Sequence, residues 1–272
     1  STIICNAIGM LAAGNAVVFC VHPLATRCSM ETVALLNRAI TGAGGPPDVV
    51  TCLSSPSIET AQQVMAHPLV RLLVVTGGGA VVKAAMASGK RAICAGPGNP
   101  SVVVDESADL DRADRDIVLG ASFDNNIICV DEKEVFVVDR VAGALFDQMR
   151  RSGAHLLSPS ELRRLEPEIF ATTHGPRKHA VIRKELVGKN AVDILGRIGG
   201  RCAADTPLLV AEVPEDHPLV WSEQLMPVLP VVRVADVGRA IELAVEAEHG
   251  FGHSASMHSK DIDALSTMAR RV

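Results

Sequence analysis

Short apolar runs alternate with amphipathic stretches along the first hundred residues. Four apolar runs predict strands, over residues 16–21, 49–53, 71–75 and 91–94. The stretches beside them predict helices, over about 3–13, 29–40, 57–66 and 78–88. Strands that are apolar throughout and separated by helices are typical of a parallel sheet covered on both faces. The pattern therefore predicts a doubly wound parallel-sheet domain in this part of the chain.

The alternation continues in the second half with longer gaps. After a predicted helix over 109–122, we expect a strand, two helices, two strands and two more helices, over 134–138, 141–151, 159–170, 207–213, 228–234, 236–248 and from about 261 onward. Residues 171–206 are rich in Gly, His, Arg and Lys and are expected to be mostly loop. The fold class is thus α/β, with a first domain over 1–121 and a second over 122–272. We expect the first to be incomplete at its N-terminus and the second at its C-terminus.

Composition narrows the class of protein. Aromatic residues make up 3% of the chain and the net charge is −5, which argues against a nucleic-acid partner. The uncharged start is interrupted by Gly9 and by the turn signal Gly14-Asn15, so we expect a buried helix and strand there and no membrane span. Seven cysteines without a C-x-x-C pair predict reduced thiols in a cytoplasmic compartment.

One cysteine, Cys129, stands in a stretch suited to nucleophilic chemistry. It follows two amides, Asn125 and Asn126, and precedes the charged residues 131–134 and a predicted strand. A cysteine at a loop-to-strand corner, with backbone and side-chain amides beside it, is a plausible nucleophile. The alternative is a buried structural thiol, which is a common role of cysteine.

Two turns and a loop offer candidate cofactor contacts. Thr76, Gly77 and Gly78 end a strand and open a helix whose free N–H groups suit a phosphate, although a tight turn without G-x-G-x-x-G explains them equally well. His22 ends the first strand, where doubly wound sheets bind ligands, or is an ordinary turn residue. Glu223 lies in a loop before a proline and is suited to bind a ribose hydroxyl pair; the alternative is a solvated side chain.

Histidines and basic residues suggest two further kinds of site. No histidine pair has a metal-ligand spacing such as H-E-x-x-H, so we expect no metal; the histidines considered are His174, His179, His249, His253 and His258. The basic residues within 177–189 are interpreted as a solvated loop, with contact to the phosphates of an anionic cofactor as the alternative.

Five segments occur in an informative order: LAAGNAVVFCVHP, TGGG, AGPGNPSVVVDESADLD, ASFDNNIICVDEKEV and SEQLMPVLPVV. Together they resemble the CoA-acylating branch of the aldehyde dehydrogenase superfamily, above all the propionaldehyde and acetaldehyde dehydrogenases of bacterial microcompartments. The aldehyde half of bifunctional aldehyde-alcohol dehydrogenases is also similar. The resemblance covers nearly the whole chain. It implies an aldehyde-dehydrogenase-like fold in which residues 1–121 bind NAD and residues 122–272 form the catalytic domain, as the middle of a longer enzyme.

The resemblance also implies roles for individual residues. Cys129 matches the catalytic cysteine. The positions that match cofactor-binding residues are His22, Pro23, Thr76, Gly77, Gly78 and Glu223. Within this set, the His-Pro pair stands where hydrolytic relatives carry a Lys-Pro that meets the adenosine ribose. The Thr-Gly-Gly turn matches the helix start near the pyrophosphate, and the glutamate matches the one that holds the nicotinamide ribose. A second oxyanion donor of the family, an Asn, is expected upstream of Ser1.

The implied reaction oxidises a short-chain aldehyde to its acyl-CoA with NAD and CoA, through a thiohemiacetal and a thioester on Cys129. Hydrolytic relatives carry a general-base glutamate in a motif that ends in Asn-Pro. Aligned on Asn99-Pro100, that position holds Cys94, and no carboxylate lies nearby in the loop. Water needs such a base, whereas a thiol with a pKa near ~8.5 is already a few per cent thiolate at neutral pH. CoA is therefore the expected acceptor.

Two other functions remain open from the sequence. One is a hydrolytic aldehyde dehydrogenase that uses a base from elsewhere and gives the free acid. The other is a non-catalytic nucleotide-binding module. The resemblance further implies a homo-oligomer and, for the microcompartment branch, shell or cargo partners and a location inside such a compartment. It implies no nucleic-acid partner and no membrane.

Overall fold

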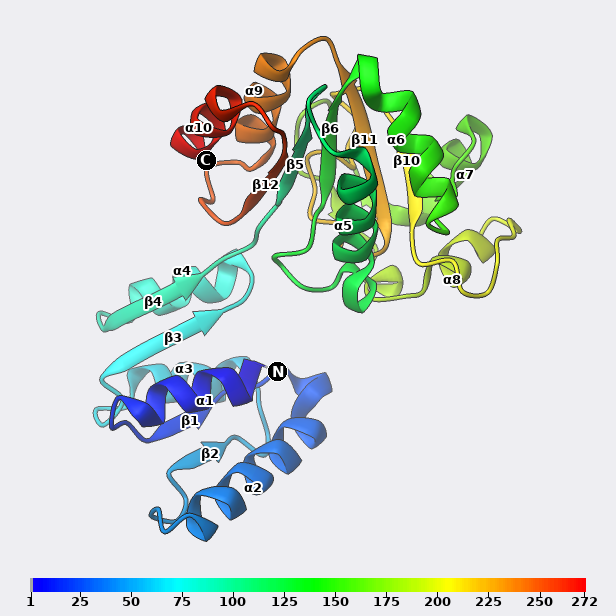
Figure 1. The fold of residues 1–272 in the computed structure, drawn as a ribbon. Helices are drawn as coiled ribbons and strands as arrows, with labels where there is room; N and C mark the ends of the chain where they lie inside the picture. The colour runs from blue at the N-terminus through cyan, green and yellow to red at the C-terminus, as the bar shows by residue number, and fades with distance from the viewer. Residues whose placement is uncertain (1) are drawn as a thin grey trace. The chain divides into compact units, whose positions relative to one another are not determined.

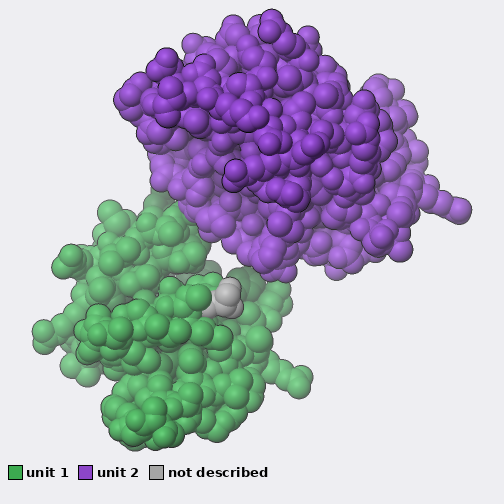
Figure 2. All heavy atoms as spheres, viewed as in Figure 1, with its two compact units in different colours: residues 1–96 green, residues 97–272 purple. Residues whose placement is uncertain are grey.

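The computed structural model describes residues Thr2–Val272, which form two compact units (Figures 1 and 2). The first unit ends at Gly96 and the second runs from Pro97 to Val272. No helix within the described residues has the length and apolar composition that crossing a membrane requires.

The first unit alternates helices and short parallel strands. Its elements are α1 (Thr2–Ala12), β1 (Val17–Phe19), α2 (Thr26–Gly42), β2 (Val50–Cys52), α3 (Ile58–Ala66), β3 (Leu72–Thr76), α4 (Gly79–Ala87) and β4 (Arg91–Ala95). Hydrogen bonds join the strands into two parallel pairs, β1 with β2 and β3 with β4. All eight elements lie where the hydrophobic pattern predicts them, within a few residues at each end. Ser57 caps α3 with a reciprocal capping box, so this start signal was visible in the sequence.

The second unit is built on a six-stranded parallel sheet. The strands are β5 (Ser101–Val104), β6 (Glu134–Val138), β7 (His155–Leu156), β10 (Leu209–Glu212), β11 (Val228–Val234) and β12 (Ala255–His258). Their order across the sheet is β12-β5-β6-β11-β10-β7. The remaining elements are α5 (Leu110–Ser122), α6 (Asp139–Arg151), α7 (Pro159–Ile169), β8 (Phe170–Thr172), β9 (Val181–Ile182), α8 (Ala191–Gly196), α9 (Val237–Ala247) and α10 (Ile262–Arg271).

Helices cover both faces of this sheet (Figure 1). On one face, Val102 and Val135 pack with residues of α5 and α6. On the other, Val103 and Phe136 pack with α7 and α9. Neighbouring residues of a strand point to opposite faces, so a strand buried on both faces is expected to be mostly apolar. In β6, which is buried along its whole length, the four residues after Glu134 are apolar.

The compact units divide between Gly96 and Pro97, whereas the element pattern predicts a boundary between residues 121 and 122. The reason is that β5 pairs with β6, and α5 packs on the same sheet through Ala113 and Ile117. Both elements precede the predicted boundary in sequence, but their apolar faces are buried in the second unit.

Part of the second unit was not predicted from the sequence. The strands β5, β7 and β12 were missed. The expected loop 171–206 contains most of the antiparallel pair β8–β9 and the short helix α8, whose Ala191, Ile194 and Leu195 are buried. Apolar residues at i, i+3 and i+4 are the helical signal that could have identified α8.

Candidate active site

The segment between α5 and β6 carries Cys129, which is half-buried and lies in a turn. The segment begins with a 3-10 helix, Phe123–Asn126, whose last three residues have φ of 45°, 56° and 60°. Asn and Asp adopt this left-handed conformation more readily than most residues, but it still stores strain that the surroundings must hold. Tertiary contacts, and not local preference, therefore fix the turn that presents Cys129.

The two amides before Cys129 provide part of this support. The Nδ2 of Asn126 donates to the carbonyl oxygens of Ala121 and Glu132, at 2.8 and 2.9 Å. The Nδ2 of Asn125 donates to the carbonyl oxygen of Gly188 at 3.0 Å. Asn126 thus closes the loop on itself and Asn125 ties it to a neighbouring segment. The amides that the sequence singled out hold the backbone of the loop.

A fully buried ammonium, that of Lys133, lies under the loop. Its Nζ donates to the backbone oxygen and Oδ1 of Asn126, at 2.9 and 2.7 Å, and to the carbonyl oxygen of Ile128 at 2.9 Å. Burial lowers the pKa of Lys133, and the nearby carboxylates of Asp131 and Glu223 act in the opposite direction. This cation is thus both hydrogen-bonded and flanked by carboxylates, which is the condition for burying a charge.

Glu223 lies half-buried beside Lys133. Burial raises the pKa of Glu223, while Lys133 and a hydrogen bond from the Gly98 backbone N–H act to lower it. The next residue, Gln224, is buried, and its Nε2 donates to the carbonyl oxygen of Lys133 at 2.8 Å. Lys133 thus bonds to the residue before Cys129, and the residue after Glu223 bonds to Lys133, so the structure brings the segments of the predicted nucleophile and the predicted ribose-binding glutamate to one buried cation.

Gly98 lies in close contact with the backbone of Cys129 and the ring of His253. A Cβ on Gly98 would lie 2.8 Å from Cγ of His253 and 3.0 Å from the carbonyl oxygen of Cys129, closer than a Cβ normally approaches. The backbone N–H of His253 donates to Glu248 at 2.8 Å. Sequence reasoning considered His253 only as a metal ligand. It missed the position of His253 at the sheet because the strand that follows, β12, has no apolar run from which a strand could be predicted.

All these groups precede strands of the same sheet (Figure 1). Gly98 precedes β5, Cys129 and Lys133 precede β6, Glu223 precedes β11 and His253 precedes β12. The four strands are neighbours and run parallel, so their starts lie at one edge of the sheet. Open α/β sheets usually bind ligands at the carboxyl ends of their strands. The candidate site of the second unit lies instead at the amino ends.

In the first unit, the candidate cofactor residues follow strands. His22 and Pro23 come after β1, and both are exposed. The Nδ1 of His22 accepts a hydrogen bond from the backbone N–H of Leu24 at 3.2 Å. An imidazole that accepts at Nδ1 carries its hydrogen on Nε2 when neutral. His22 therefore offers a ligand a hydrogen-bond donor at Nε2.

Thr76 ends β3, and Gly78 is the N-cap of α4. The cap has no side chain, and the first turn of α4 contains no acidic residue, so no carboxylate of that turn competes for the helix N–H groups. A Cβ on Gly78 would have no heavy atom within 4 Å, and Gly77 has only Val81 at 4.0 Å. Neither glycine has a positive φ. Neither the backbone conformation nor the packing within the chain requires glycine at these two positions. The free space beside them suits a phosphate group bound at a helix N-terminus.

Comparison with known proteins identifies the family to which the chain belongs. The family model described as "Aldehyde dehydrogenase family" matches residues 1–272. The chain belongs to the aldehyde dehydrogenase family. It is 47% identical over 273 residues to the acetylating acetaldehyde dehydrogenase EutE of Salmonella typhimurium, covering 100% of this chain and 58% of that relative. It is 43% identical over 270 residues to the CoA-propanoylating propanal dehydrogenase of the same organism, covering 99% and 57%.

Solved structures confirm the aldehyde-dehydrogenase-like α/β fold. The propionaldehyde dehydrogenase of Rhodopseudomonas palustris with bound propionyl-CoA has a TM-score of 0.93 at 46% identity, over 99% of this chain and 58% of that one. A propionaldehyde dehydrogenase from the fucose utilisation bacterial microcompartment of Clostridium phytofermentans has a TM-score of 0.93 at 39% identity, over 99% and 61%. The chain thus spans a little under three fifths of the length of its curated relatives.

Within this aldehyde dehydrogenase chain, the position predicted for a general base holds a thiol. Cys94 lies half-buried in β4, and the residues from there to Pro100 include no Asp or Glu. The Asn99 that anchors the alignment is buried, and its Nδ2 donates to the carbonyl oxygens of Val220 and Ala247, each at 2.9 Å. The loop is therefore held in place by an amide and carries no carboxylate able to activate water.

One residue of the basic run, Arg177, makes several contacts within the second unit. Arg177 pairs with Glu215 and Glu246, and its guanidinium lies 5.7 Å from the ring centroid of Trp221. This arginine is held by two protein carboxylates and is still exposed, as expected for a solvated loop. Across residues 2–272, no three His, Cys, Asp or Glu side chains are grouped as a metal site.

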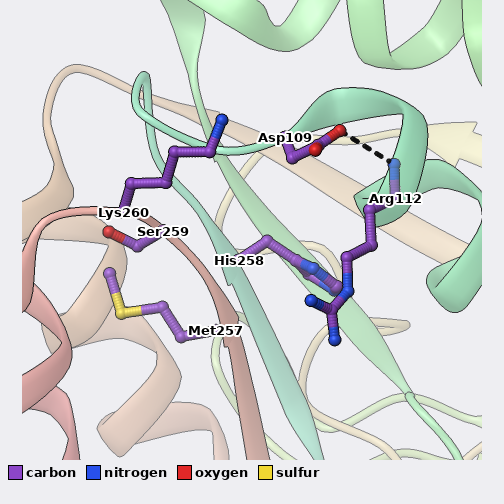
Figure 3. A pocket seen from close by; sticks show the side chains of 6 residues that line it. All are labelled: Asp109, Arg112, Met257, His258, Ser259 and Lys260. Carbon is purple, nitrogen blue, oxygen red and sulfur yellow. Dashed lines mark hydrogen bonds between the residues drawn. The ribbon is translucent and has the colours of Figure 1, made fainter.

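A pocket of about 290 Å³, lined mostly by polar residues, lies at the carboxyl edge of the second sheet, between the end of β12 and the start of α5 (Figure 3). Several of its charged groups are used within the chain. Asp109 accepts the backbone N–H of Arg112 at 3.3 Å, and the Nε of Arg112 pairs with Asp116 at 3.3 Å. Burial lowers the pKa of His258. None of the residues lining this pocket is a predicted site residue, so the candidate site is the amino edge.

Proposed function

We propose that the enzyme containing this chain oxidises a short-chain aldehyde to its acyl-CoA, using NAD and CoA, with Cys129 as the nucleophile. The observation that carries the proposal is the Cys129 turn, whose strained backbone is held in place by Asn126 and the buried Lys133. Relatives named as acetylating and CoA-propanoylating dehydrogenases support the same reaction class. The proposal concerns the whole enzyme, because the chain spans only part of these relatives.

The first step forms a bond between Cys129 and the aldehyde. The thiolate sulfur adds to the carbonyl carbon, and the carbonyl oxygen becomes an oxyanion. The backbone N–H of Cys129 makes no hydrogen bond within residues 2–272, so it is available to donate to this oxyanion. A donor already in place stabilises the charge without reorganisation during the reaction.

The second step returns the oxyanion to a carbonyl and leaves an acyl thioester on Cys129. NAD, when bound, supplies the acceptor for the hydride that leaves the aldehyde carbon. Thr76, Gly77 and Gly78 would hold its pyrophosphate at the uncapped start of α4. His22 and Pro23 would meet the adenosine ribose, and the carboxylate of Glu223 would accept from the nicotinamide ribose hydroxyls.

The third step transfers the acyl group. The CoA thiolate attacks the thioester carbon, and the Cys129 thiolate leaves. The absence of a carboxylate between Cys94 and Pro100 favours this acceptor over water, because water needs a general base and a thiol needs far less help. A structure of the R. palustris relative with bound CoA and an acylated cysteine supports an intermediate of this kind.

The test is CoA dependence. NADH formation from propionaldehyde is followed at saturating NAD with CoA, without it, and with desulfo-CoA as the control that lacks only the thiol. Of these three conditions, we expect turnover only in the one that contains CoA. The product identified by mass spectrometry should be propionyl-CoA. Comparable turnover without CoA, yielding propionic acid, would establish the hydrolytic alternative. No NADH under any condition would favour the non-catalytic module.

We also propose that the enzyme is a homo-oligomer in the cytoplasm, as the resemblance implies. Its packaging as cargo of a bacterial microcompartment is supported by one structural neighbour that comes from such a compartment. Light scattering on the purified enzyme gives the oligomeric state. Co-purification with microcompartment shells tests the location, and an enzyme found only outside the shells would contradict it.

A further inference from the structure

The peptide group between Ile128 and Cys129 links the buried cation to the nucleophile. Its carbonyl oxygen accepts from Nζ of Lys133 at 2.9 Å and from the backbone N–H of Asp131 at 3.2 Å. In a trans peptide the C=O and the N–H point in opposite directions. The N–H of Cys129 must therefore point away from Lys133. Two hydrogen bonds on one end of this peptide thus determine where the other end points.

We propose that Lys133 is a positioning residue that makes the Cys129 N–H an effective oxyanion donor through this shared peptide group. The inference rests on the proposed function, because it assigns the N–H to the oxyanion of the Cys129 adduct. A bond from an ammonium to a carbonyl is charge-assisted and stronger than a neutral one. Hydrogen bonds in a chain polarise one another, so a cation on the C=O strengthens the N–H as a donor.

The charge of Lys133 suits the place where the loop begins. Helix α5 ends at Ser122, just before the loop, and helix C-terminal ends carry a negative partial charge. The amino edge of a parallel sheet therefore lacks the helix N-termini that usually stabilise anions. A buried ammonium beside the Ile128–Cys129 peptide supplies the positive charge that the helices do not.

Lys133 is fixed at both ends. Its side chain makes three hydrogen bonds and is fully buried, so it is enclosed by protein. Its backbone N–H donates to Pro100 at 2.9 Å, and its carbonyl oxygen accepts from Gln224 at 2.8 Å. A residue held in this way acts on the reaction through the peptide group, not through direct contact with the aldehyde.

The test compares two reactions of the same thiol. Alkylation of Cys129 by iodoacetamide creates no oxyanion, whereas acylation by p-nitrophenyl acetate passes through one. Both are measured on the peptide that contains Cys129 by mass spectrometry, because six other free cysteines also react. For Lys133→Met we expect acylation to fall about 10²-fold, the effect of losing one oxyanion donor, with alkylation changed by less than about 3-fold. Lys189→Met, at an exposed lysine, is the control and should change neither rate.

Two outcomes would overturn the inference. If both rates fall together, Lys133 only holds the thiol in place. If neither falls, Lys133 has no role in the reaction. Neither reagent involves NAD or CoA, so a failure of this test can be distinguished from a failure of the CoA-dependence test of the proposed function. An enzyme without CoA-dependent turnover can still show the selective fall in acylation, and an enzyme with CoA-dependent turnover can lack it.

A second measurement needs no variant, should Lys133→Met fail to fold. In the wild type, the ratio of acylation to alkylation is followed toward alkaline pH. Both reactions use the Cys129 thiolate, so its ionisation cancels in the ratio. We expect the ratio to fall as Lys133 loses its proton, at a pH below 10.5, because burial lowers its pKa. A ratio that stays constant up to that pH contradicts the inference.

Besides Cys129, the titratable groups facing Lys133 are Asp131, Glu223 and Glu134. Glu134 is the one whose pKa burial raises well above its ordinary value, so the pH series is repeated with Glu134→Gln. The fall in the ratio should remain in this variant. Its disappearance would assign the fall to Glu134 and overturn the inference.

Discussion

The two candidate regions are built on opposite edges of parallel strands. In the second unit, Cys129 and Glu223 lie at amino ends, among buried side chains that hold the backbone in strained conformations. In the first unit, His22 and the Thr76–Gly78 turn lie at carboxyl ends, are largely exposed and have few side-chain partners. The first kind of region fixes atoms in place, and the second leaves room and free N–H groups.

This difference matches the separate requirements of a nucleophile and of a bound dinucleotide in the proposed reaction. A nucleophile must be held within a fraction of an ångström of its target, which requires rotamers and backbone locked by neighbours. A dinucleotide brings its own charge and shape, so a bare helix N-terminus with glycines suits it. Residues at the amino edge should therefore change the chemistry when altered, and residues at the carboxyl edge should change only cofactor affinity.

The largest effect is expected at the nucleophile itself. Replacing Cys129→Ala should abolish CoA-dependent NADH formation, a loss of roughly 10⁴-fold or more, because no other group can form the covalent adduct. The control is Cys202→Ser, a second half-buried thiol of the same unit, which should retain activity. The measurement is the rate of NADH formation at saturating propionaldehyde, NAD and CoA. Retained activity in Cys129→Ala would remove this residue from the mechanism.

A smaller but still large effect is expected where Gly98 meets the Cys129 backbone. A methyl group at this position would overlap the ring of His253 and the carbonyl oxygen of Cys129, so one of them must move. Displacing a catalytic loop by about 1 Å can lower the rate about 10²-fold, and we expect Gly98→Ala to lower kcat by that amount. Gly143→Ala is the matched control, because a Cβ there meets no atom within 4 Å. Equal kcat in the two variants would show that the amino edge is less tightly fixed than its contacts imply.

The same contrast explains which parts were predictable from sequence. Strands β6 and β11 were predicted with their observed ends, because a strand buried on both faces is mostly apolar and each of them carries a run of at least four apolar residues. The strand β12, with Ala, Ser, Met and His, has no such run, so its edge of the sheet and the place of His253 were missed. The role of Lys133 was hidden for another reason. A run of four charged residues ordinarily lies in water, and only tertiary contacts bury this one.

A moderate effect, confined to the cofactor, is expected at the carboxyl edge. Gly78→Leu fills the space at the start of α4, so the KM for NAD should rise about 10-fold, equivalent to about 1.4 kcal/mol of binding. Acylation of Cys129 by p-nitrophenyl acetate should not change, because that reaction uses no NAD. Gly9→Leu, at an exposed glycine of α1 with equal free space, is the control. A matching loss in acylation would mean that the two regions are not separable.

The smallest effect concerns stability and follows from a buried acid below the amino edge. Glu134 is fully buried and accepts a hydrogen bond from Ser101, and burial raises its pKa well above its ordinary value of 4.5. Below pH 4.5, Glu134 is protonated in both the folded and the unfolded chain. Between pH 4.5 and the raised pKa of the folded chain, the unfolded chain releases the proton while the folded chain retains it. The free energy of unfolding should therefore fall as pH rises from about 4.5 to the folded pKa.

Glu134→Gln removes this dependence. The variant should gain stability relative to the wild type by about 1.4 kcal/mol for each pH unit within that window, with no pH-dependent difference below it. Urea unfolding followed by the fluorescence of Trp221, the single tryptophan and a buried residue of the second unit, measures the difference. Glu185→Gln, at an exposed carboxylate, should show no pH-dependent difference from the wild type. If the difference between Glu134→Gln and the wild type is also constant with pH, Glu134 is ionised in the fold. The amino edge would then hold one more buried negative charge beside Lys133 than we infer.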